Sequence, residues 1–168
     1  MYRAALAVTA QQLSKDAEEL KKAKTQLKSE QAHAKEIAVS LKDASRLAVS
    51  LKGLYDKEEA ELKEMRKVVE KQQKGLNKQK NLTPDTRDAY MQVLDKEQKE
   101  LSYALREVGE RQRAISDMEQ SLQNAQTALQ TYVNEIQQKE LDINTMEAQI
   151  KEREATIKAE QKSAKNLQ

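Results

Sequence analysis

The chain has 168 residues, with 30 Lys and Arg against 28 Asp and Glu, so its formal net charge is +2. It contains no Cys, Phe or Trp, only three Gly and one Pro, and 35% of its residues are charged. So few turn-forming residues exclude most β-rich folds. The abundance of strong helix formers instead predicts long helices or a coiled coil.

The first half of the chain carries an apolar residue at every seventh position, a series that we call the first seam of leg one. A strict seven-residue repeat of this length predicts that the helix supercoils with a partner helix. The series comprises Leu6, Leu13, Leu20, Leu27, Ala34, Leu41, Ala48, Tyr55, Leu62, Val69 and Leu76.

The midpoint of the chain combines a stop signal with a start signal for helices. Asn81 can end the first helix, Thr83 is a favourable N-cap, and Pro84 suits the first position of a second helix. Asp85 then places a negative charge where the helix dipole favours it. The sequence therefore predicts a tight turn at about 81–84, between leg one at about 2–81 and leg two at about 84–167.

The second half of the chain has the same repeat, which forms the first seam of leg two. Its members are Leu94, Leu101, Val108, Ile115, Leu122, Leu129, Ile136, Ile143, Ile150, Ile157 and Ala164. Together the two legs predict an all-α fold in which residues 1–168 form a single long antiparallel two-helix coiled-coil hairpin. Residues 1–82 have 18 basic and 12 acidic groups and residues 83–168 have 12 basic and 16 acidic groups, so the legs attract each other.

A second seam lies three residues after each member of the first and is less apolar. Charged residues occupy several of its positions and must extend their charges to the edge: Glu58, Glu97, Arg111, Lys139 and Arg153. Facing residues of an antiparallel pair have numbers with a constant sum, and a turn near Leu82 and Thr83 predicts a sum of about 166. That register places small residues opposite large ones: Ala34–Tyr132, Leu41–Ala125, Ala44–Leu122, Ala48–Met118 and Leu62–Ala104.

The sequence offers little support for catalysis, cofactor binding or nucleic-acid binding. Glu30 and His33, the only histidine, have the Glu-x-x-His spacing of di-metal bundles, but such a site needs a second copy of the pair. Leg one is basic between Lys63 and Lys80, yet this stretch lacks the aromatic residues that single-strand binders use. We therefore expect no enzyme activity, cofactor, small-molecule substrate or nucleic-acid partner, and no membrane-spanning segment within the chain.

Both ends and the turn resemble one protein family. The opening Tyr2-Arg3-Ala4-Ala5-Leu6, the closing Ser163-to-Gln168 segment and the turn are similar to the α-helical hairpin of HlyD-like periplasmic adaptors, also called membrane fusion proteins. Family tips carry Arg-x3-Leu-x6-Ser/Thr and then an acidic residue five positions later. Here Leu76, Thr83 and Asp88 match this spacing, and Gln72 stands where the family has arginine.

The resemblance implies a role in secretion or efflux and a docking tip formed by Gln72, Leu76, Thr83 and Asp88. Its implied partners are an outer-membrane exit duct at the tip, neighbouring adaptor copies side by side, and an inner-membrane transporter reached through domains outside this chain. Its implied compartment is the periplasm. The alternative is a structural stalk or tether of a secretion apparatus or another assembly, in the cytoplasm or elsewhere, with no specific chemistry at the tip.

Overall fold

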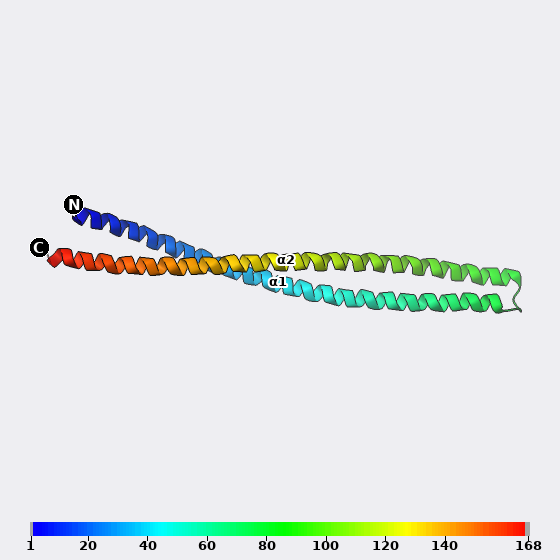
Figure 1. Cartoon of the computed structure of the whole chain (residues 1–168). Helices are drawn as coiled ribbons and strands as arrows, with labels where there is room; N and C mark the ends of the chain where they lie inside the picture. The colour runs from blue at the N-terminus through cyan, green and yellow to red at the C-terminus, as the bar shows by residue number, and fades with distance from the viewer. Residues whose placement is uncertain (1, 167–168) are drawn as a thin grey trace. The chain divides into compact units, whose positions relative to one another are not determined.

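The computed structural model describes residues 2–166 and contains two helices. Helix α1 spans Tyr2–Lys78 and helix α2 spans Pro84–Asn166. The helices run antiparallel and are joined by the loop 79–83, as Figure 1 shows. The predicted all-α helical hairpin with its turn near Leu82–Pro84 is therefore confirmed. The predicted end of leg two at Leu167 lies outside the described residues.

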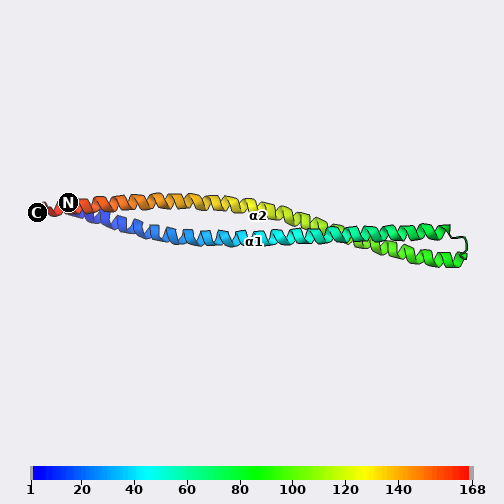
Figure 2. The ribbon, with the colours of Figure 1, turned by 90° about the horizontal axis from the view of Figure 1, so that it is seen from below.

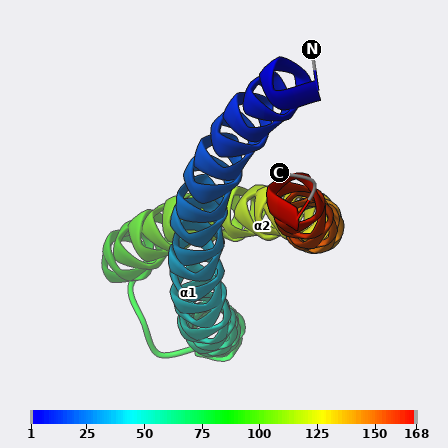
Figure 3. The same cartoon turned by 90° about the vertical axis from the view of Figure 1, so that its left-hand side faces the viewer.

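The chain divides into two compact units, each containing a segment of both helices. The terminal unit combines residues up to 40 with those from 125 onward, and the turn unit comprises residues 41–124. Within each unit α1 and α2 cross, in Figure 1 for the terminal unit and in Figure 2 for the turn unit, so they coil about each other. Figure 3 is viewed from the side at which α1 begins and α2 ends, and both of these segments belong to the terminal unit.

The buried core consists entirely of first-seam residues. In the terminal unit one cluster contains Leu13, Leu20, Leu27, Ala34, Ile136, Ile143, Ile150 and Ile157. In the turn unit the buried residues are Ala48, Val69, Val108 and Ile115, and Val108 is only 1% exposed. Of the five charged second-seam residues that the sequence predicted to extend to the edge, Glu97, Arg111, Lys139 and Arg153 are exposed, whereas Glu58 is half-buried. The first seam of each helix therefore supplies the buried core, and in the terminal unit the half-buried Ala23, Tyr132 and Val133 pack against it from outside that seam.

The register of the two helices differs from the predicted sum of 166. Polar side-chain pairs between the helices have residue sums of 168 (Asp56–Gln112, Gln73–Asp95), 169 (Asp16–Arg153, Glu30–Lys139) or 171 (Lys24–Glu147, Lys52–Glu119, Glu59–Gln112). First-seam residues that line common grooves have a sum of 170: Leu6 with Ala164, Leu27 with Ile143, Ala34 with Ile136 and Val69 with Leu101. The predicted register was therefore wrong by about one helical turn.

The physical reason for this register is the polarity of the second seam. A sum near 170 places first-seam residues opposite one another, so large apolar side chains from both helices meet. The second seam then moves to the edge, where its charges stay hydrated and pair with one another. The predicted small-against-large pairs would have placed several of these charges in the interface instead. Two longer-range contacts have sums of 165 and 166: His33 edge-on to Tyr132 and Arg111 over the Tyr55 ring.

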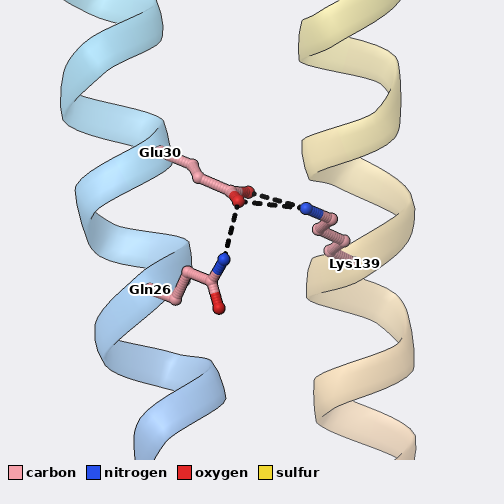
Figure 4. Close-up of polar contacts among 3 residues, drawn as sticks. All are labelled: Gln26, Glu30 and Lys139. Atoms are coloured by element: carbon pink, nitrogen blue, oxygen red, sulfur yellow. Dashed lines mark hydrogen bonds and ion pairs between the residues drawn. The ribbon is translucent and has the colours of Figure 1, made fainter.

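The edges of the interface carry ion pairs between the helices. Figure 4 shows one of them, in which the Lys139 ammonium donates hydrogen bonds of 3.0 and 3.1 Å to the two Glu30 carboxylate oxygens. Gln26 also donates to Glu30, from one turn earlier on α1. On the terminal unit's other edge, Lys24 lies 2.8 Å from Glu147. Exposed pairs of this kind contribute little stability individually, but they help to fix the register.

Two paired carboxylates, Glu147 between the helices and Glu59 within α1, make the stability of the hairpin fall at acidic pH. Hydrogen bonding to Lys24 is the main cause that lowers the pKa of Glu147, and hydrogen bonding to Lys63 and then to Gln112 lowers the pKa of Glu59. Their stabilising contribution is complete above the unfolded pKa of about 4.3 and is lost as pH falls through the lower folded pKa. We therefore expect the melting temperature to fall between about pH 5 and pH 3.

Circular dichroism melts at a series of pH values would test this expectation. Glu147→Gln should flatten part of the acid dependence, whereas Glu154→Gln, at an exposed position on the same helix, should leave it unchanged. An unaltered acid dependence in Glu147→Gln would show that its pairing with Lys24 does not persist in solution.

Candidate docking site at the turn

The end of α1 lies three residues earlier than the sequence predicted. The helix ends at Lys78 rather than near Asn81, and the Gln79 amide closes its last turn with a 3.3 Å hydrogen bond to the Leu76 carbonyl. The Arg87 guanidinium donates a 2.6 Å hydrogen bond to the Gln79 carbonyl. This contact supplies a partner to a carbonyl that the helix end would otherwise leave to water. It ties the start of the loop to α2.

Thr83 is the N-cap of α2, as the sequence predicted. Its Oγ1 accepts a 3.3 Å hydrogen bond from the Thr86 amide, and its hydroxyl donates a 2.7 Å hydrogen bond to the Thr86 Oγ1. The Arg87 amide makes the first helical hydrogen bond, 3.0 Å long, to the Thr83 carbonyl. Pro84 and Asp85 follow in the first turn. The Thr83 hydroxyl therefore stabilises the helix start and has only one acceptor position left for a partner.

The other three predicted tip residues lie in different surroundings. Leu76 is half-buried in the last turn of α1, where it continues the first seam, and Asp88 is exposed in the second turn of α2. Gln72 is exposed further along α1, where it lines a groove together with Glu97 of α2. The structure thus places Leu76, Thr83 and Asp88 close to the loop along the chain, and Gln72 on the side of the turn unit.

Arg87 is the residue at the turn that sequence reasoning missed. Besides its bond to Gln79, its Nε is buried and has no hydrogen-bond partner among the described residues. The sequence does not show whether an arginine one turn into a helix bonds a preceding loop or points into solvent. Its role depends on the path of the loop, which places the Gln79 carbonyl within 2.6 Å of the Arg87 guanidinium.

The described residues show neither a metal-binding cluster nor a membrane-spanning helix. Among residues 2–166 no three metal-ligating side chains converge, and Glu30 is engaged by Lys139. No helix in the described part of the chain has a stretch long and apolar enough to cross a bilayer. No family model, curated protein or solved structure matches this chain.

Proposed function

We propose that this chain is the α-helical hairpin of a periplasmic adaptor that bridges an inner-membrane transporter to an outer-membrane exit duct in secretion or efflux. The observation that carries the proposal is the turn. Leu76, Thr83 and Asp88 have the spacing of the resembled tips, and the loop that they flank joins two antiparallel helices. Thr83 and Asp88 are exposed there, so both can meet a partner end-on.

In this role the tip contacts the duct, and the sides of the hairpin contact neighbouring copies. The transporter is reached through domains outside this chain, in the periplasm. Catalysis, a cofactor, a small-molecule substrate and nucleic acid have no part in it. Gln72 lines a groove with Glu97 rather than lying at the loop, so the polar contact that the family makes through arginine is made here by the exposed Arg66 or Lys71.

A structural stalk or tether is the second candidate, and one observation favours it. The Thr83 hydroxyl caps α2 and Leu76 is half-buried in the seam, so both tip residues also serve the fold. A spacer between two larger parts needs these roles and no others. Such a protein works equally well in the cytoplasm.

Photo-crosslinking in the native cell would separate the two candidates. A photoreactive amino acid at Lys80, exposed in the loop, should capture an outer-membrane protein that mass spectrometry identifies, whereas the same probe at exposed Asp117 should not. Asp88→Arg should reduce the tip crosslink at least tenfold at normal abundance, because a buried charge contact at a small interface is costly to reverse. Asp117→Arg is the matched control.

Two results would count against the adaptor. One is a tip probe that captures no outer-membrane protein, and the other is recovery of the chain from the cytoplasm. Gln72→Arg provides a further check, because restoring the family residue should maintain or strengthen the crosslink.

A further inference from the structure

Large apolar side chains are exposed along one side of the turn unit. Of its nine exposed large hydrophobic residues, seven occupy second-seam positions or the positions three residues further along the same helix. Residues three apart lie on the same face of a helix. The seven are Leu47, Leu54, Met65, Val68, Tyr90, Val93 and Met118. We call this surface, defined by the heptad positions that these residues occupy on α1 and α2, the exposed flank.

The exposed flank contains a groove between the two helices. Val69 and Leu101 of the first seam form its floor together with Ala104, and Met65 and Val68 stand along it. Met65 and Val68 are 53% and 52% exposed. Because Ala104 is small and faces the flexible Met65, the groove can adapt to apolar side chains from another helix.

The charges beside this groove are almost all negative. Glu64, Glu97 and Glu100 line it, and among the described residues only Glu64 of these three forms an ion pair, with Lys67 at 3.4 Å. The heptad positions of the whole exposed flank carry five glutamates, one arginine and no lysine: Glu58, Glu61, Glu97, Glu100, Glu107 and Arg111. An apolar groove with an acidic margin is complementary to a helix that has an apolar stripe and basic sides.

We propose that the exposed flank binds a basic amphipathic helix of a partner protein, which lies in the groove and completes a three-helix bundle. A second copy of this chain fits less well. The exposed apolar side chains of α1 near the turn, Met65 and Val68, belong to the exposed flank itself, whose charges are mostly negative, so two flanks packed together would bring like charges close. The exposed Lys67, Lys71 and Lys74 of α1 occupy heptad positions outside the flank. This inference does not depend on what the tip binds.

The test uses the full chain and a synthetic 28-residue peptide with four heptads, Leu at the two seam positions and Lys or Ala elsewhere. Fluorescence anisotropy should show binding that weakens with added salt, as expected for paired surface charges. A scrambled peptide of the same composition and a peptide with Glu in place of Lys should bind at least tenfold more weakly. Equal binding by the scrambled peptide would overturn the proposal.

Variants of the chain locate the site. Glu97→Lys with Glu100→Lys, and separately Val68→Asp, should each weaken binding at least tenfold. The matched controls are Glu110→Lys with Asp117→Lys on the outer face of α2, and Val49→Asp, whose residue is 68% exposed but lies off the flank. These controls should change binding less than twofold. Losses as large in the controls as in the flank variants would overturn the proposal.

Sedimentation velocity of the chain alone tests whether a second copy of the chain covers the exposed flank. We expect a monomer at concentrations at which the peptide binds. A dimer that Val68→Asp abolishes would show that a second copy covers the flank and would overturn the assignment to a partner helix.

Discussion

Ile143→Asp is expected to lower the free energy of unfolding by more than about 3 kcal/mol, because it places a carboxylate without a partner in an apolar cluster. Ile143 is 8% exposed and packs in the terminal-unit core with first-seam residues of α1. Two-helix interfaces have few other contacts to compensate for such a loss. Urea titration followed by circular dichroism measures the change.

The matched control for this variant is Leu141→Asp. Leu141 lies two residues earlier on α2 and is 61% exposed. Its replacement should change stability by less than about 0.5 kcal/mol, as is usual for exposed sites. A change at Ile143 as small as that at Leu141 would show that Ile143 does not pack in the seam in solution.

The double variant Glu30→Leu with Lys139→Leu is expected to raise the melting temperature by about 5 °C. Both residues occupy second-seam positions, and leucine at both would extend the apolar interface without leaving a charge unpaired.

Lys139→Leu alone should lower the melting temperature. The Glu30 side chain is only 17% exposed, so it would keep its charge but lose its cation. Glu30→Leu alone should be mild, because the Lys139 side chain is 54% exposed and can turn to water.

Alkaline pH gives this prediction a second readout. The hydrogen bond to Glu30 is the main cause that raises the pKa of Lys139. A raised pKa contributes stability that is complete below the unfolded value of about 10.4 and is lost as pH rises through the folded value. The advantage of the double variant over the natural sequence should therefore grow above about pH 10. A difference in melting temperature between the two proteins that stays constant up to pH 12 would contradict the pairing of Lys139 with Glu30.

The turn shows why docking and folding must be measured together in this protein. The Thr83 hydroxyl caps α2 and Leu76 continues the seam, so changing either residue alters stability as well as any contact with a partner. Asp88 is exposed in the second turn of α2, which makes Asp88→Arg the cleaner probe of the tip. Val68, Glu97 and Glu100 of the exposed flank are also exposed, so changing them tests binding with little effect on folding.

The sequence alone determined the fold class, the two helices, the buried first seam and the N-cap at Thr83. These features depend on local chemistry, since a seven-residue apolar repeat defines a helix face and a Thr-Pro-Asp sequence defines a helix start. The adaptor function and the docking role of Gln72, Leu76, Thr83 and Asp88 stay predictions, because they depend on partners.

Only the tertiary structure decided the register, the end of α1 and the position of the exposed flank. A sum of 166 and a sum near 170 both satisfy a heptad repeat, and they differ in whether polar second-seam residues face the interface or its edge. That choice depends on the combined cost of hydrating or burying many side chains at once. The end of α1 at Lys78 likewise depends on Arg87 of α2 reaching the Gln79 carbonyl, a contact between residues eight apart that no local pattern encodes.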